Sequence, residues 1–356
     1  MEAFLSISTD MTYEMMDAIR SNIRTGINRV IDSGVKIRKG QSLAIKINNL
    51  GPFSPDTAAC THPQVLRAVI EEFKLLDLNI TVYEDCLSED YVEASGIKAV
   101  IEDTGVTFVN LKNRPYTKVL VEGETYEYSS DILQADYLVT VPKMKTHVLT
   151  NYTGAIKLMY GSITKQQRKM FHCHDNMREF SKILVDIYSI KLPILVVLDG
   201  IISMDGIGPS HGNPNNSGLL MVSDDGVLLD YFASSFMKYK PLEIESIRIA
   251  LERGLSKCEP DEITLIGDSL PSPNTSFTLI PVLSEKLGKR YRSIVIGELL
   301  LKEELCTGCG ICIQSCPFNA ISMAPFPVTD YDKCIRCYCC LELCPQGAYS
   351  LQRKLK

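Results

Sequence analysis

The chain has 356 residues, of which 45% are hydrophobic and 22% charged, and its formal net charge is −6 at pH 7. This composition is that of an ordinary globular protein and excludes a disordered chain, while the length suits two domains. The first ten residues lack a basic start and a long apolar run, so we expect neither a signal peptide nor a membrane span. No basic tail or aromatic-studded basic stripe points to nucleic acid as a partner.

Helical and strand patterns alternate through most of the chain. In chain order they predict helices over 11–32, 64–76, 91–102, 227–237 and 244–253, and strands over 42–48, 80–83, 106–110, 137–142, 193–199 and 218–223. A short antiparallel hairpin is predicted at 119–122 and 125–128. The strands at 137–142 and 193–199 are apolar on both faces, which is typical of a sheet covered on both sides. We therefore expect an α/β body over residues 1–297, with a mixed, mainly parallel sheet flanked by helices.

Two local signals refine this division. Thr61 is the expected cap of the helix at 64–76, with Pro63 in its first turn. Residues 268–297 contain three prolines and little helical periodicity, so they are interpreted as the connector to a C-terminal domain over 298–356.

The C-terminal segment carries two copies of one cysteine spacing. The first run is Cys306, Cys309, Cys312 and Cys316, the second is Cys334, Cys337, Cys340 and Cys344, and a proline follows each run. This is the spacing of two-cluster bacterial ferredoxins, in which the fourth cysteine of each run ligates the other cluster. We therefore predict two 4Fe-4S clusters, one held by Cys306, Cys309, Cys312 and Cys344, the other by Cys334, Cys337, Cys340 and Cys316.

The repeat continues beyond these cysteines. Pro317–Met323 matches Pro345–Leu351 as a short helix start followed by a strand, which predicts a small α+β ferredoxin domain with twofold-related halves. The alternative of two all-cysteine zinc sites is disfavoured, because such sites take their ligands from two separated pairs. Gly308 and Gly310 allow the backbone to wrap closely around a cubane. Cys339 is surplus to the second run, and we expect it to pack without ligating iron.

Nine of the 13 cysteines lie in this C-terminal segment, and the other four are scattered without pairing logic, so disulfides are not expected. Thiolates committed to iron require a reducing compartment. We therefore expect a cytoplasmic protein from an organism that lives with little oxygen.

Polar side chains follow the first strand that is apolar on both faces. Lys143, Lys145, Thr146 and His147 come directly after it, and Lys157 follows ten residues later. Lysines, a histidine and hydroxyls can bind a carboxylate or a phosphate, which makes Lys143, Thr146 and Lys157 candidate substrate ligands. Lys145 or His147 could donate a proton to the substrate and are the candidate catalytic residues. The alternative is a solvated basic loop.

A glycine-rich stretch follows the second such strand. It contains Asp199, Asp205, Gly206, Gly208 and Gly212, and the glycines would let backbone N–H groups approach a ligand closely. A dinucleotide fingerprint is not met, because the chain returns to a strand instead of opening a helix. The alternative is a turn-rich connector that needs glycine only for its backbone angles.

Two weaker candidates remain. His172, Cys173 and His174 could form a soft metal site, but no further ligand lies near them in sequence and a capped helix start at Asp175 explains much of the pattern. Asp224 either belongs to a cap for the following helix or faces the substrate site.

Several of these motifs occur together in one known family. Pro142–His147, Thr153–Lys157, Asp199-Gly200, Met204–Pro209, Gly212 and Ser223–Asp225 together resemble the family named domain of unknown function 362. Many of its members carry a C-terminal 4Fe-4S ferredoxin module, as the cysteine runs predict here. The resemblance implies cluster binding and a ligand site on an α/β body, and it supplies no substrate.

Two functions of different classes fit these features. In the first, the ferredoxin domain feeds single electrons to a small anionic or carbonyl-containing metabolite bound at the strand ends of the body. In the second, the chain is an electron carrier or adaptor that docks on a partner redox enzyme. Both require a low-potential electron donor or acceptor protein. Fusion favours the first, because linking an electron source to its acceptor raises its effective concentration.

Overall fold

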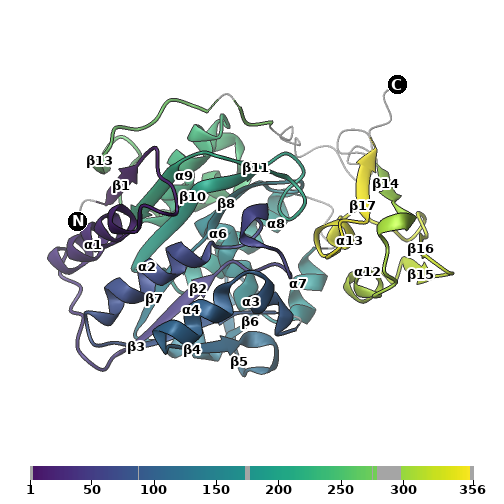
Figure 1. Ribbon diagram of the computed structural model, residues 1–356, viewed down its shortest axis with the longest axis horizontal. Helices are drawn as coiled ribbons and strands as arrows, with labels where there is room; N and C mark the ends of the chain where they lie inside the picture. The colour runs from purple at the N-terminus through teal and green to yellow at the C-terminus, as the bar shows by residue number, and fades with distance from the viewer. Residues whose placement is uncertain (1–2, 87, 173–176, 275, 279–297, 353–356) are drawn as a thin grey trace.

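The computed structural model describes residues 3–86, 88–172, 177–274, 276–278 and 298–352. Figure 1 shows an α/β body with a small C-terminal region at one end. Within the described residues, the body contains one 11-stranded sheet, and three two-stranded sheets accompany it. No helix in the described part of the chain is both long and apolar enough to cross a membrane.

The main sheet has the strand order β13-β1-β12-β10-β7-β2-β3-β4. In this order the strands are Thr264–Gly267, Phe4–Ser8, Leu219–Ser223, Leu195–Asp205, Tyr137–Val141, Ser42–Ile47, Asn79–Glu84 and Thr107–Asn110. All neighbours from β10 to β4 are parallel, whereas β12 runs antiparallel to β10 and to β1. The predicted mixed, mainly parallel sheet is confirmed.

Side chains of the central strands alternate between two cores. Leu43, Ile45 and Ile47 of β2 belong to one core, and Ala44 between them belongs to the other. The first core is covered by helices α1 (Met16–Asp32), α2 (Pro63–Lys74) and α4 (Ile97–Thr104). The second is covered by α6 (Ala155–Leu158), α8 (Met177–Ile190), α9 (Gly226–Phe236) and α10 (Glu245–Glu252). Burial on both faces explains the continuous apolar strands of the sequence.

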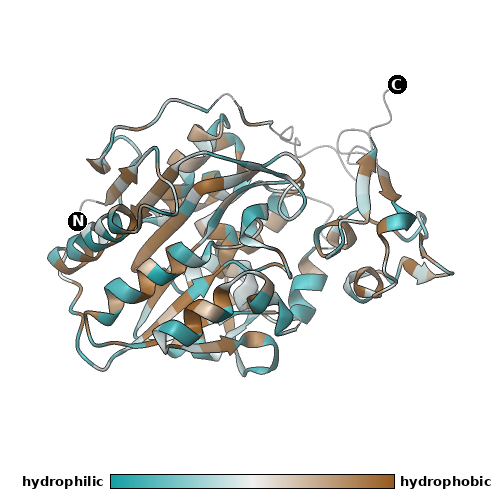
Figure 2. Ribbon diagram, viewed as in Figure 1, coloured by the Kyte–Doolittle hydropathy of each residue, from teal (hydrophilic) through white to brown (hydrophobic). Residues whose placement is uncertain are grey.

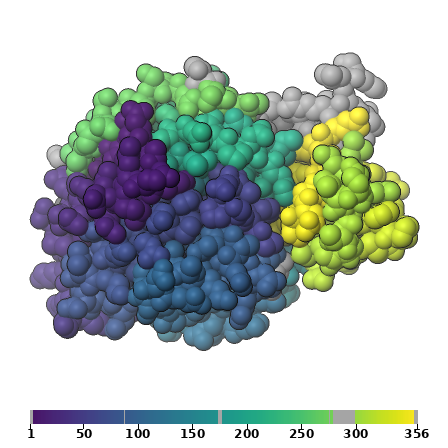
Figure 3. Space-filling view, in the orientation of Figure 1, coloured from purple at the N-terminus to yellow at the C-terminus, as the bar shows by residue number. Residues whose placement is uncertain are grey.

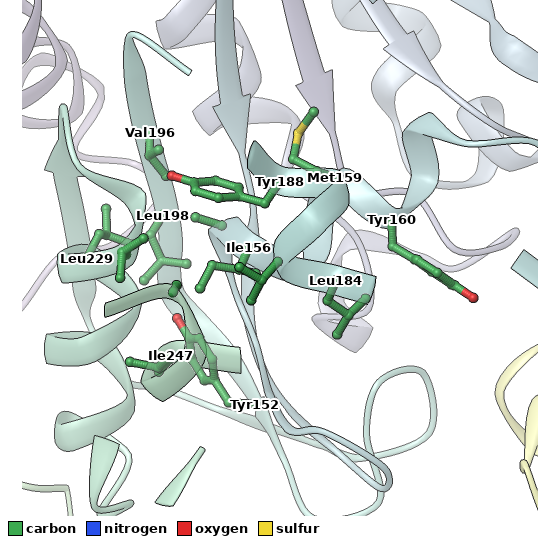
Figure 4. Packing of buried hydrophobic residues seen from close by; sticks show 14 of the residues in the cluster. Tyr152, Ile156, Met159, Tyr160, Leu184, Tyr188, Val196, Leu198, Leu229 and Ile247 are labelled. Carbon is green, nitrogen blue, oxygen red and sulfur yellow. The ribbon is translucent and has the colours of Figure 1, made fainter. Parts of the chain in front are cut away.

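Figure 2 shows the resulting pattern, with hydrophobic strands inside and hydrophilic outer helix surfaces. Figure 4 shows the second core, where Tyr188 of α8 lies against Val196 and Leu198 of β10. The helix caps follow the sequence in part. Asp225 caps α9 by accepting hydrogen bonds from two backbone N–H groups at 2.9 Å. The cap of α2 is His62, not the expected Thr61, whose hydroxyl instead donates to the Val141 carbonyl at 2.7 Å.

Several elements differ from their predicted form. The helix expected at 91–102 is split into α3 (Asp90–Ala94) and α4, because Gly96 between them has a positive φ of 72°. Helix α7 (Lys165–Phe171) and strand β1 are additional elements, and helix α8 follows the helix start expected at Asp175. The antiparallel hairpin is present as β5 (Tyr116–Val121) and β6 (Glu124–Ser129), followed by α5 (Ser130–Gln134). Residues 279–297 of the expected connector lie outside the described residues.

The C-terminal region contains two strand pairs and two short helices. They are β14 (Glu298–Leu301) with β17 (Tyr349–Gln352), β15 (Ile321–Met323) with β16 (Pro327–Thr329), α12 (Ile311–Ser315) and α13 (Cys339–Glu342). The backbone repeats with the cysteines, since Gly308 and Gly310 have φ of 68° and 72° and the equivalent Arg336 and Tyr338 have 57° and 59°. The same left-handed turns therefore occur in both halves, although only the first half uses glycine there.

This region packs directly on the body, as Figure 3 shows. Val148 and Leu149 of the body belong to the same hydrophobic cluster as Tyr338 and Leu341 of the C-terminal region. The Ser210 hydroxyl donates a hydrogen bond to the Glu342 carbonyl at 2.5 Å. A pocket is formed at this junction.

Candidate functional site

The two polar stretches predicted from the sequence meet in the structure, but neither is a simple loop. Residues 143–147 form strand β8 (Lys143–His147), which pairs with β10 and with β9 (Asn151–Thr153). Strand β10 runs through Asp199 to Asp205 and then pairs with β11 (Asn213–Asn215). The Thr146 hydroxyl donates to the Gly206 carbonyl at 2.9 Å, and a Cβ on Gly208 would lie 2.0 Å from the Thr146 carbonyl oxygen.

Lys143 and Asp199 form a buried ion pair that belongs to the body itself. Their side chains are 0% exposed, with 2.8 Å between the Lys143 Nζ and an Asp199 carboxylate oxygen. Lys143 and the same carboxylate also bond the Tyr13 hydroxyl at 2.8 and 2.9 Å, and the His62 backbone N–H donates to Asp199. Because these bonds tie β8, β10 and the starts of two helices together, we assign Lys143 and Asp199 a structural role. The substrate-binding role expected for Lys143 and Asp199 from the sequence stays a prediction beside this structural role.

The remaining acidic and glycine candidates also serve the fold. Asp205 accepts a hydrogen bond from the Thr278 N–H at 3.1 Å, and a Cβ on Gly212 would lie 2.1 Å from the Asp205 carbonyl. The close approaches at Gly208 and Gly212 are thus to the protein's own backbone and not to a ligand. Asp224 is at the opposite edge of the sheet, because the antiparallel β12 brings its end to the start of β10. There it accepts a hydrogen bond from the Phe4 N–H and pairs with Lys257, and it does not line the pocket at the junction with the C-terminal region.

A pocket of about 190 Å³ lies between the body and the C-terminal region. Six basic side chains line it, and they are Lys46, Lys145, Lys157, Lys165, Arg168 and Lys169. Three carboxylates line it, and they are Glu84, Asp85 and Glu342. The C-terminal region contributes Ile311, Gln314, Ser315, Cys339, Glu342 and Leu343. The lining carries an excess of positive charge, which favours an anionic ligand.

Two of the basic groups are neutralised within the wall. Lys46 pairs with Glu84 at 2.7 Å, with both side chains buried, and Arg168 pairs with Asp85. Lys145 and Lys157 differ, because the Glu342 carboxylate interacts electrostatically with both of them. This end of the pocket therefore has two lysines for one carboxylate.

The protonation of this end is set by burial. Burial lowers the pKa of Lys145 to about 7, with the neighbouring Lys157 and Lys143 charges acting in the same direction. Burial raises the pKa of Glu342 to about 7. Both groups can therefore change charge near neutral pH, which is the range in which a proton donor is effective.

His147 is next to the pocket without lining it. Its Nδ1 accepts hydrogen bonds from the Leu149 and Thr150 N–H groups at 3.0 and 3.3 Å, so the Nε2 of the neutral ring carries the proton. The Nε2 lies 3.6 Å from Glu342 Oε1, and neither atom has a hydrogen-bond partner in the described structure. Burial keeps the pKa of His147 well below its usual value. His147 therefore faces Glu342, whereas Lys145 lines the pocket.

The eight cysteines of the two runs line two separate cavities. Cys306, Cys309, Cys312 and Cys344 line one cavity, and Cys316, Cys334, Cys337 and Cys340 line the other. These are the two sets of four proposed from the sequence, including the exchanged fourth cysteines. Backbone N–H groups point at two of the sulfurs, from Ala320 to Cys316 Sγ at 3.2 Å and from Ala348 to Cys344 Sγ at 3.4 Å. Thiol donors with N–H groups directed at them fit the requirements of an iron–sulfur cluster.

A cubane holds its four cysteines farther apart than a single ion does. Among the described residues, no three or more His, Cys, Asp or Glu side chains gather into a site for one metal ion.

Cys339 lines the second cysteine cavity and also the pocket between the body and the C-terminal region. The second cysteine cavity and the pocket are therefore neighbours, with the Cys339 side chain between them.

Comparison with known families places both parts of the chain. The family model described as Domain of unknown function (DUF362) matches residues 43–235, which is more than half of the chain. The chain belongs to this family. A 4Fe-4S binding domain matches residues 301–322 and 327–350, once for each cysteine run, and supports an electron-transfer role. The predicted fusion of a DUF362 body with a ferredoxin module is confirmed.

Individual relatives of this DUF362 protein are distant. The Thylakoid-associated protein sll1697 of Synechocystis sp. is 22% identical over 257 residues, covering 71% of this chain and 80% of the relative. The lactate racemase apoprotein from Thermoanaerobacterium thermosaccharolyticum has a TM-score of 0.42 at 14% identity, and a protein from Thermotoga maritima has 0.37 at 12%. These matches cover 66% and 65% of this chain, and the chain spans 57% and 59% of those two structures.

Sequence reasoning missed the pocket residues outside the DUF362 motifs. Glu342 occupies the same place in the second cysteine run as Gln314 in the first, and both line the pocket. A polar residue at equivalent positions between the third and fourth cysteines is a signal that could have found them. His172 lines the pocket too, whereas Cys173 and His174 of the suggested soft metal site lie outside the described residues.

Proposed function

We propose that this protein is an iron–sulfur oxidoreductase in which the ferredoxin domain passes single electrons to a small anionic or carbonyl-containing metabolite. The metabolite binds in the pocket between the DUF362 body and the ferredoxin domain. The observation that carries this proposal is that Cys339 lines both this pocket and the second cysteine cavity. A carrier would not need a basic pocket in contact with its electron-transfer domain.

Two 4Fe-4S clusters are part of this proposal. Cys306, Cys309, Cys312 and Cys344 would hold the first, and Cys334, Cys337, Cys340 and Cys316 the second. Bound clusters supply one-electron chemistry, and the protein supplies the docking of its two domains, the exclusion of water and the charges around the metabolite. Because the thiolates must stay reduced, we place the protein in the cytoplasm of a cell that experiences little oxygen.

Lys157 and Lys145 have separate tasks in this proposal. Lys157 is partly buried at the pocket wall and binds the anionic group of the metabolite. Each electron added to a carbonyl must be balanced by a proton, and Lys145, with a pKa of about 7, can deliver one. His147 does not line the pocket, and its role here is to hold a neutral ring with its protonated Nε2 3.6 Å from Glu342.

The test is reoxidation of the reduced protein. Anaerobically purified protein is reduced with dithionite, freed of excess reductant and mixed with small carboxylates and keto acids, while cluster absorbance is followed. We expect one chemical class to reoxidise the wild-type protein, and the Lys157→Gln variant to respond at least 10-fold more slowly. If no small molecule reoxidises it, and a redox enzyme co-purifies instead, the protein is the carrier or adaptor.

A further inference from the structure

A second concave surface adjoins the pocket and shares Lys165 and Lys169 with it, and it lies between helix α7 and the segment that follows the first cysteine run. Its α7 wall consists of Lys165, Gln166, Lys169 and Met170, and its other wall consists of Cys316, Pro317, Phe318 and Asn319. Cys316 also lines the second cysteine cavity. The groove therefore reaches the protein surface directly beside one of the proposed ligands of the second cluster.

The chemistry of this groove is basic and apolar. No Asp or Glu is among the described residues that line it. Lys165 and Lys169 are one helical turn apart, and the positive charges of Lys169 and Lys112 add to burial in lowering the pKa of Lys165. Met170 and Phe318 are 51% and 42% exposed, one on each wall, so the groove offers apolar surface beside its lysines.

The edge of the other cysteine cavity has a different character. Cys309 is exposed there, and Glu303 and Glu304 are exposed just before the first run, beside one lysine, Lys302. An acidic protein would be attracted to the groove at Cys316, whereas the two glutamates next to Cys306 would repel it. The two routes into the ferredoxin domain thus differ in the charge of the partner that they accept.

We propose that the groove formed by α7 and residues 316–319 is the docking surface for an acidic one-electron carrier protein. Lysines steer the carrier, and Met170 and Phe318 supply the small apolar contact of a short-lived complex. The inference rests on a cluster held in part by Cys316, as in the proposed function, but not on a metabolite in the pocket.

The test measures reduction of the full-length, iron-loaded protein by an acidic [2Fe-2S] ferredoxin that has been reduced beforehand. Stopped-flow absorbance gives the second-order rate constant at several salt concentrations. For the wild-type protein we expect the rate constant to fall as salt rises. For Lys165→Glu combined with Lys169→Glu we expect a loss of about 10-fold at low salt, within the range typical of electrostatic steering.

Control variants distinguish a loss of carrier docking from a loss of the cluster or of the fold. Lys39→Glu combined with Lys98→Glu changes two exposed lysines elsewhere on the body, and we expect wild-type rates from it. All variants should contain the same iron and bleach to the same final extent with dithionite. Phe318→Ala should slow reduction by the carrier without changing its salt dependence.

The outcomes are distinct. Unchanged rates and salt dependence in the α7 double variant would overturn the inference. If Glu303→Lys combined with Glu304→Lys speeds reduction while the α7 variant has no effect, the carrier docks at Cys309 instead. A protein that is reduced normally by the carrier but reoxidised by no metabolite would refute the proposed function and leave this docking surface intact.

Discussion

Two lysines of strand β8, two residues apart, lie in different environments in this protein. Lys143 is paired with Asp199 inside the body, whereas Lys145 lines the pocket and donates to the Ala59 carbonyl at 2.7 Å. The sequence placed both in one candidate site, because spacing alone does not reveal which lysine finds a buried carboxylate. Burial and pairing decide the difference, and they depend on residues more than 50 positions away.

This difference can be tested by stability. Lys143→Met leaves the buried Asp199 carboxylate without its cation, and we expect a loss of about 3–5 kcal/mol in the free energy of unfolding. Lys157→Gln should lose less than about 1 kcal/mol, because its side chain is only partly buried. Urea denaturation followed by circular dichroism measures both. Equal losses would show that the structural and ligand-binding roles are not separated in this way.

The pH dependence of anion binding follows from Lys145. Its folded pKa of about 7 is below its ordinary value, so the side chain loses its positive charge as pH rises through 7. The Lys157 and Lys143 cations lower this pKa and the Glu342 carboxylate raises it. We expect the affinity for an anionic metabolite to fall as pH rises from about 6 to 8. In Lys145→Met the part of this decrease that comes from Lys145 should disappear, while the part that comes from deprotonation of Glu342 should remain, and isothermal titration calorimetry of the two proteins measures the difference.

Cys339 is the third residue with a testable role. The second run already has four cysteines in its proposed ligand sets, so Cys339→Ala should keep the wild-type content of iron and sulfide. Because its side chain separates the second cysteine cavity from the pocket, reoxidation by a metabolite should change in this variant. Loss of four irons per chain would mean that Cys339 is a ligand.

At the scale of single elements, the sheet and most helices could be predicted because apolar periodicity is local. For helix α8 only a capped start at Asp175 was expected and no extent was given, although Phe180, Ile183, Leu184 and Ile187 have helical spacing and are buried. The strand predicted from the sequence ends at Asp199, because a charged residue and a glycine normally end a strand, whereas β10 continues to Asp205. Here Lys143 neutralises the charge, and Gly200 fits where a Cβ would lie 2.9 Å from the Leu219 carbonyl. A pocket at the strand ends beside the ferredoxin domain could be predicted, but the part of its wall that α7 and Glu342 supply could not, because those residues reach it only when distant segments dock.

The repeated left-handed turns give a prediction at the same scale. Gly308 has a φ of 68° with no atom near the position of a Cβ, so Gly308→Ala adds backbone strain without a clash. We expect it to destabilise the first cysteine loop by about 1 kcal/mol. Gly308→Asn should cost less, since asparagine tolerates this conformation. The measurement is the rate at which each variant loses its cluster on warming under argon. Equal rates for Gly308→Ala and Gly308→Asn would show that the turn is not under strain.

At the scale of the whole molecule, we propose that the body over 1–297 and the ferredoxin domain over 298–356 fold on separate cores. Residues of the body fill two large clusters of their own, and the third cluster centres on the C-terminal region. Removal of iron with a chelator under oxidising conditions should therefore unfold the C-terminal region and leave the body intact. Calorimetry should show the main transition preserved. One joint transition that disappears with the iron would refute the division.

Both domains contribute to the pocket wall. The binding of any tight ligand is therefore coupled to the docking of the two domains. A molecule that touches Lys157 on one side and Gln314 on the other binds only when the domains are docked, so it must strengthen the docking by the same factor by which docking strengthens its own binding. A cell that accumulates the metabolite would then hold more of this protein in the form competent for electron transfer. The concentration of the metabolite would then set how long the two domains stay docked, as well as the rate of the reaction in the pocket.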